Sequence, residues 1–139
     1  MANEMTYESD GTTYSGHLAD GSRGAPAPGV LVIHEGSGLG PHARAKADAL
    51  AALGYVAFAP DIFGGPVQDM QQASAYIGDL SGDIAKLRRR CTAALDALAA
   101  HPSTDGGKLA AIGFCFGGQA ALELARSGAS LAATVGFHS

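Results

Sequence analysis

The feature that most constrains the fold of this chain is a series of short, uninterrupted apolar runs separated by helical patterns. The runs lie at residues 29–33, 55–59, 108–112 and 131–137. The helical patterns lie at residues 45–53, 84–98 and 117–126. Apolar runs without polar alternation are typical of parallel strands that are covered on both faces. Strands that alternate with helices form right-handed β-α-β units, so the sequence predicts an α/β fold with a mostly parallel sheet and helices on both faces.

A further pair of strands is expected before this alternation begins. Residues 5–7 and 14–19 have strand composition, and the turn sequence Ser9-Asp10-Gly11 lies between them. Such a turn joins two antiparallel strands into a hairpin. No internal repeat or linker-like segment divides the 139 residues, and a chain of this length can bury a sizeable core. We therefore expect residues 1–139 to form a single α/β domain.

The composition excludes several classes of protein. Hydrophobic residues make up 47% of the chain and charged residues only 16%, which argues against disorder. The formal net charge of −4 gives no basic footprint for nucleic acid or for an anionic membrane. The polar residues 1–10 do not resemble a signal peptide, and no apolar run has membrane-spanning length. We expect a cytoplasmic protein with no nucleic-acid or membrane partner.

Cys115 lies in a sequence that is typical of a catalytic nucleophile. The segment Gly113-Phe114-Cys115-Phe116-Gly117 leaves a predicted strand and enters a predicted helix. A nucleophile elbow of the G-x-S-x-G type does the same, with serine in place of cysteine. Glycines are needed at both ends because the turn is strained and the strand and helix approach closely. A buried core cysteine is the alternative, but glycines at both required positions favour the nucleophile.

Four segments of the chain, VLVIHEGSGLG, LGYVAFAPDIFGG, GFCFGG and VGFHS, carry a resemblance to a known family. Through them the chain resembles the dienelactone hydrolase family of the α/β-hydrolase fold over nearly its whole length. The resemblance implies the hydrolysis of small lactones or esters through a thioester on the cysteine. It also implies a Cys-His-Asp triad and no cofactor.

The resemblance also assigns roles to residues around the strand at 29–33. Glu35 follows this strand, where the family carries a glutamate that contacts the resting thiol of Cys115. Ligands bind at the carboxyl edge of such sheets, so Glu35 stands where a site is expected, with a solvated loop glutamate as the alternative. The backbone N–H groups of Gly36 and Phe116 are the predicted oxyanion donors, because this fold takes one donor from each of these loops.

Other motifs carry less information about function. His34-Glu35 begins like the zinc motif H-E-x-x-H, but Gly38 occupies the position of the second histidine. No metal site is therefore predicted, and His34 is expected to be a hydrogen-bonded residue at the end of a strand. Cys91 lies on the apolar face of its predicted helix and is expected in the core. The basic run at 86–90 is expected to be a solvated helix face.

The acid and the base of a triad are not evident after Cys115. In this fold both follow the nucleophile in chain order, yet Glu123 lies within a predicted helix and His138 is the second residue from the end. His138 matches a GFH segment of the family, so it is expected near the pocket rather than as the base. Residues 131–135 would also form an open sheet edge. We therefore expect the N-terminal part of a longer domain, completed by a C-terminal segment that carries an Asp and a His.

Three functions fit these observations. The first is a cysteine-dependent hydrolase of a small lactone or ester. The second is a non-catalytic binding module of α/β-hydrolase type, and the third is a redox-active thiol protein. The substrate stays open between an anionic dienelactone and a neutral ester or lactone. Arg44 is a candidate contact for a substrate carboxylate, with a solvated arginine as the alternative, and residues 70–77 offer no Lys or Arg.

Overall fold

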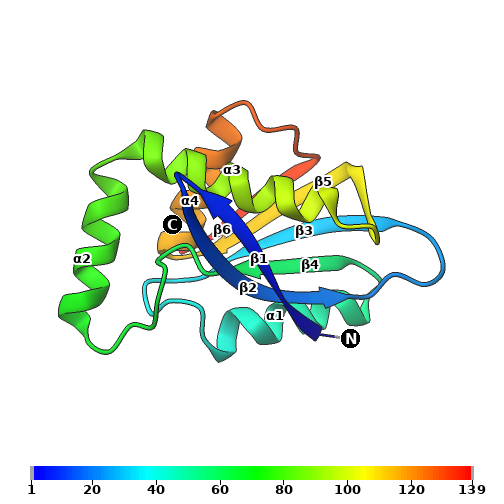
Figure 1. The fold of residues 1–139 in the computed structure, drawn as a ribbon, viewed down its shortest axis with the longest axis horizontal. Coiled ribbons are helices and arrows are strands. Elements are labelled where there is room, and N and C mark those ends of the chain that lie inside the picture. The colour runs from blue at the N-terminus through cyan, green and yellow to red at the C-terminus, as the bar shows by residue number, and fades with distance from the viewer. Residues whose placement is uncertain (1, 139) are drawn as a thin grey trace.

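A computed structural model describes residues 2–138, which form a six-stranded sheet flanked by four helices (Figure 1). In chain order the elements are β1 Ala2–Ser9, β2 Thr12–Asp20, β3 Ala27–Ile33, α1 Pro41–Ala52, β4 Val56–Pro60, α2 Met70–Ser81, α3 Ile84–Ala100, β5 Thr104–Phe114, α4 Phe116–Arg126 and β6 Ala133–Phe137. Met1 and Ser139, the ends of the predicted domain, lie outside the described residues. Within residues 2–138, no helix has both the length and the apolar character needed to cross a bilayer.

The strands are ordered β1-β2-β4-β3-β5-β6 across the sheet. The strands β3, β4, β5 and β6 run parallel, whereas β1 pairs antiparallel with β2 and β2 pairs antiparallel with β4. The hairpin turn between β1 and β2 places Asp10 and Gly11 at positive φ, which is typical of two-residue hairpin loops. The predicted α/β fold with a mostly parallel sheet is confirmed.

The two faces of β3 explain why its apolar run is unbroken. Leu31 and Ile33 pack into the core under α3 and α4, whereas Val30 and Val32 pack into the core under α1. All four side chains are buried. Because successive strand residues point to opposite faces, a strand that is covered on both sides needs an apolar residue at every position. Figure 1 shows α1 on one side of the sheet and α3 on the other.

Two helices differ from the sequence prediction. α1 begins at Pro41, four residues before the predicted start, because proline fits the first turn of a helix without losing a hydrogen bond. No helix is predicted from the sequence at α2, although Ala73, Ile77 and Leu80 recur at helical spacing; Leu80 is its one fully buried residue. The residue before it, Asp69, caps the helix: its side chain accepts a hydrogen bond from the Gln72 N–H (2.8 Å), so local capping rather than burial marks its start.

The sheet ends on one side at β6. Val135 and Phe137 of this strand are 42% and 45% exposed, although both are large apolar residues. The predicted open apolar edge is therefore present in the structure.

Candidate active site

Cys115 stands on the sharp turn between β5 and α4. Its backbone has φ +53° and ψ −116°, a conformation that residues other than glycine rarely adopt. Two hydrogen bonds hold the turn: the Cys115 N–H donates to the Phe137 carbonyl (2.7 Å), and the Gly118 N–H donates to the Cys115 carbonyl (2.9 Å). The thiol is exposed. A strained turn that presents an accessible side chain is what a nucleophile elbow provides.

Gly113 and Gly117 let the strand and the helix approach each other around this turn. A Cβ on Gly117 would lie 2.5 Å from the carbonyl oxygen of His34 and closer still to that of Ile33. A Cβ on Gly113 would lie 2.6 Å from the amide nitrogen of Gly118 and closer still to the Gly117 carbonyl. The predicted need for glycine at both positions is confirmed, because either side chain would overlap backbone atoms.

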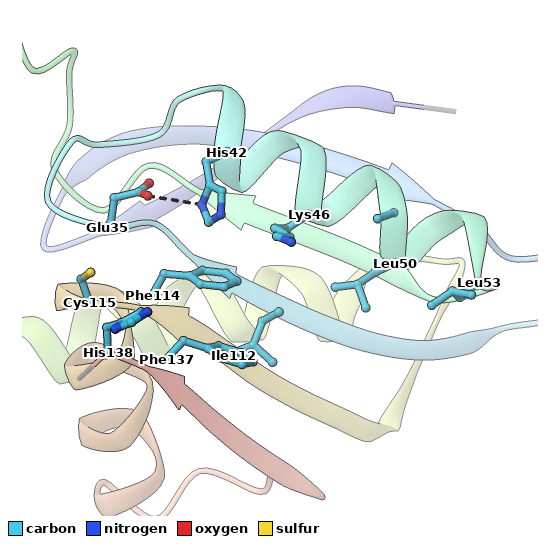
Figure 2. A pocket seen from close by; sticks show the side chains of 11 residues that line it. Glu35, His42, Lys46, Leu50, Leu53, Ile112, Phe114, Cys115, Phe137 and His138 are labelled. Carbon is cyan, nitrogen blue, oxygen red and sulfur yellow. Dashed lines mark ion pairs between the residues drawn. The ribbon is translucent and has the colours of Figure 1, made fainter.

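A groove of about 600 Å³ runs from Cys115 along the α1 face of the sheet (Figure 2). The α1 helix forms one wall, and the ends of β5 and β6 form the floor. Figure 2 shows the polar side chains of Glu35 and His42 at the Cys115 end and the apolar side chain of Leu53 at the far end. Most of the lining is apolar; four polar or thiol side chains gather at the Cys115 end, and Lys46 lies midway along α1. This distribution is typical of a pocket for a small organic ligand.

Glu35 follows β3 directly and is held from two sides. Its backbone carbonyl accepts a hydrogen bond from Nδ1 of His34 (2.8 Å), and its carboxylate Oε2 lies 3.2 Å from Nδ1 of His42. Figure 2 shows the carboxylate paired with His42 at the end of the groove where Cys115 lies. The structure therefore brings the predicted nucleophile and the predicted thiol partner to the same pocket, with the carboxylate engaged by a histidine.

His34 anchors the loop that carries Glu35. Its Nε2 accepts a hydrogen bond from the Ile62 N–H (3.2 Å), so the ring proton resides on Nδ1, the atom that donates to the Glu35 carbonyl. The side chain is fully buried, and this burial lowers its pKa and favours the neutral ring. The prediction that His34 is a hydrogen-bonded residue at the end of a strand is confirmed.

The two predicted oxyanion donors, Phe116 and Gly36, directly follow the groove residues Cys115 and Glu35 in the chain, but neither lines the groove itself. Phe116 is the first residue of α4, so its N–H is one of the amides that a helix leaves without an internal partner. Gly36 lies in the loop after β3 and borders a neighbouring depression rather than the groove itself. The Ile77 side chain of α2 would come within 3.0 Å of a Cβ on Gly36. The oxyanion role of both amides stays a prediction.

The two residues considered for the triad occupy different places. His138 follows β6 with φ +56° and lines the groove together with Cys115. Glu123 lies on α4, where its carboxylate pairs with Arg88 (2.8 Å) and Arg126 (2.7 Å). These two pairs hold the pKa of Glu123 below its usual range. Glu123 thus belongs to an ion-pair cluster with Arg88 and Arg126, whereas His138 lines the same groove as Cys115.

Arg44, the candidate contact for a substrate carboxylate, does not line the groove. It borders a separate depression together with Asp61. The reason is the rotation of α1: Arg44 follows His42 by two residues, which is about 200° around a helix. When His42 points into the groove, Arg44 points away from it.

The expectation that residues 86–90 form a solvated face is wrong at Arg90. This side chain is buried, its Nη1 donates to the Ile62 carbonyl (2.8 Å), and its guanidinium lies 4.6 Å from the centroid of the Tyr14 ring. Arg90 shares one helix face with Leu87, because residues three apart lie on the same side. The same face carries Cys91, whose thiol has a pKa raised by burial to about 12, so its predicted core position is confirmed.

Sequence reasoning missed two groove residues, His42 and Lys46. Both lie on α1, four residues apart, and therefore face the same way. The available signal was this i, i+4 spacing immediately after the loop that carries Glu35, once the helix was known to begin at Pro41. Among residues 2–138, no group of three His, Cys, Asp or Glu side chains lies close enough to hold a metal ion.

Comparison with known proteins gives consistent results. The family model described as the dienelactone hydrolase family matches residues 16–139. Protein usf of Aquifex pyrophilus is 32% identical over 130 residues, which cover 90% of this chain and 55% of that protein.

Two solved structures are similar over 99% of this chain and 59% of their own, each with a TM-score of 0.94. One is m3DLH, with 48% identity, and the other is a dienelactone hydrolase-like promiscuous phosphotriesterase from metagenomic libraries, with 47% identity. The chain thus spans little more than half the length of the relatives it matches.

Proposed function

Because the chain belongs to the dienelactone hydrolase family, we propose that it supplies the nucleophile half of a hydrolase of small lactones or esters. Cys115 is the nucleophile, and Glu35 is the carboxylate that accepts its proton. The single observation that carries this proposal is the backbone of Cys115, a residue other than glycine held at φ +53° at the mouth of a groove. Strain of this kind costs about 1–3 kcal/mol and is found mainly at functional sites.

The proposed reaction begins with attack of the Cys115 sulfur on the carbonyl carbon of the substrate. The thiol proton passes to the Glu35 carboxylate, and the Phe116 and Gly36 N–H groups stabilise the oxyanion that forms. The bond from carbon to the leaving oxygen then breaks, the alcohol takes up a proton, and a thioester remains on Cys115. Water hydrolyses the thioester and restores the thiol.

The later steps need a base to activate water and an acid to protonate the leaving alcohol. We propose that these groups come from a C-terminal segment that carries an Asp and a His. This is supported by the greater length of the similar solved structures, of which this chain covers 59%. It is also supported by the apolar residues beside the groove and at the sheet edge, Leu53, Val135 and Phe137, which are 75%, 42% and 45% exposed. Further strands or a helix packed there would cover them.

Acylation by an activated ester tests the nucleophile without requiring the complete triad. The 139-residue chain is mixed with p-nitrophenyl acetate, and p-nitrophenolate release is followed together with the mass of the protein. We expect one acetyl group per chain, on Cys115, followed by very slow turnover. Cys115→Ser should abolish the adduct, and the matched control Cys91→Ser should retain it because Cys91 is buried in the core.

Other outcomes have distinct meanings. Binding of a lactone without acylation would favour the non-catalytic binding module. Rapid multiple turnover would mean that the base lies within this chain, and His138→Asn would then test the histidine that lines the groove. An activated phosphotriester is a second substrate class to assay, since one similar structure at 47% identity is described as a promiscuous phosphotriesterase.

A further inference from the structure

Building on the proposed function, we propose that His42 is a positioning residue that holds the Glu35 carboxylate at the Cys115 end of the groove. His42 is the second residue of α1, and its Nδ1 lies 3.2 Å from Oε2 of Glu35. This pairing engages one of the two carboxylate oxygens. Glu35 can therefore be held by His42 and still accept the proton of the thiol.

The ring of His42 is itself fixed by aromatic contacts. It meets the ring of Phe114 edge-on, with 4.8 Å between the centroids, and Phe114 stacks on Phe137 with 5.1 Å between the centroids. These contacts connect α1 to the end of β5, which leads into the turn at Cys115, and to the end of β6, where the Phe137 carbonyl accepts the Cys115 N–H. His42 therefore joins the helix wall of the groove to the elbow through one continuous set of contacts.

The direction of the Glu35 side chain is what His42 adds to the site. His34 already fixes the Glu35 backbone through its hydrogen bond to the Glu35 carbonyl (2.8 Å). The Glu35 side chain is 26% exposed. Without a partner it would lose side-chain entropy each time it pointed toward Cys115, whereas the pairing with His42 holds one direction in advance. Because a misplacement of about 1 Å can slow a reaction by up to a hundredfold, we expect loss of His42 to slow acylation about tenfold.

The test compares two substitutions that separate the group of His42 that pairs with Glu35 from its aromatic ring. His42→Phe keeps an aromatic ring beside Phe114 and removes the partner of Glu35, whereas His42→Lys supplies a cationic partner for Glu35 and removes the ring. Acetylation of Cys115 by p-nitrophenyl acetate is measured in both. We expect a rate about tenfold lower in His42→Phe and a rate close to the wild type in His42→Lys.

The chain offers a matched control in His17 of β2, a second histidine that pairs with a carboxylate. His17 pairs with Asp48 of α1 (2.7 Å), and neither residue lines the groove. His17→Phe removes an ion pair of the same kind, so it should leave the acetylation rate unchanged. The melting temperature of each variant is measured in parallel, so that loss of fold is told apart from loss of positioning.

Double substitution shows whether His42 acts through Glu35. If it does, His42→Phe has no further effect in a Glu35→Gln background, which is itself slow. Slow acetylation in Glu35→Gln with a normal rate in His42→Phe would overturn this inference alone. A normal rate in Glu35→Gln, or no acetylation of the wild type, would refute the proposed roles of Glu35 or Cys115, and the inference would fall with them.

Discussion

Replacement of Gly117 by alanine is the most direct test of how the elbow is built. Gly117 lies in the first turn of α4, where the helix leaves the sheet beside the end of β3. An alanine Cβ there would stand 2.5 Å from the carbonyl oxygen of His34 and closer to that of Ile33. Ordinary contact begins near 3.4 Å, so the helix and the strand would have to separate by about 1 Å.

The expected loss of stability depends on which atoms would have to move to make room for the alanine. β3 lies between β4 and β5 in the middle of the sheet, and the clashing atoms belong to its backbone end rather than to a flexible side chain. Overpacking of this kind costs about 1–3 kcal/mol, and we expect a value near 3 kcal/mol because no neighbour can give way. For a chain of this size, that corresponds to a melting temperature lower by about 10 °C.

Gly78→Ala is the matched control. Gly78 lies within α2, and a Cβ there would meet nothing within 4 Å. The same chemical change should therefore stabilise the protein by about 0.5–1 kcal/mol, because alanine is the better helix former. Thermal unfolding followed by circular dichroism measures both variants. A melting temperature for Gly117→Ala within about 2 °C of the wild type would refute the close approach of β3 and α4.

Three further outcomes are expected. Iodoacetamide should modify exposed Cys115 well before Cys91, whose thiol is buried and has a pKa raised to about 12. Equal labelling of the two cysteines in the folded protein would contradict the proposal that Cys115 is the reactive thiol. Arg90→Met should cost about 1–3 kcal/mol in urea unfolding because it leaves a buried backbone carbonyl unpaired. Arg89→Met, which removes an exposed side chain, should leave the urea midpoint nearly unchanged. Burial lowers the pKa of His34 below its ordinary value of 6.5, so below that pH this residue binds a proton more readily in the unfolded chain than in the folded one. The contribution of His34 to the free energy of unfolding should therefore be fully present above pH 6.5 and decrease as the pH falls below that value. The decrease should be weaker in His34→Gln, and an equal decrease in that variant would assign the effect to other groups.

The sequence alone determines most of the strands, three of the helices and the glycine-flanked turn at Cys115. Uninterrupted apolar runs such as 29–33 report burial on both faces of a strand, and that property is set by the residues themselves. The glycines on either side of Cys115 are equally informative, because a turn that brings a strand and a helix into backbone contact excludes any side chain at those positions. Local patterns of this kind need no knowledge of the rest of the fold.

Only the tertiary structure decides which side chains meet across elements. Whether His42 or Arg44 faces the groove depends on where α1 begins and how it is rotated over the sheet, and a residue pattern with small alanines on one side defines that rotation poorly. In the sequence, Arg90 belongs to a basic run that predicts an exposed face. In the folded protein, the packing of α3 buries its side chain, which donates a hydrogen bond to the Ile62 carbonyl. The pairing of Glu35 with His42 joins a strand end to a helix start. Its existence depends on the relative placement of two elements, which the sequence of neither one specifies.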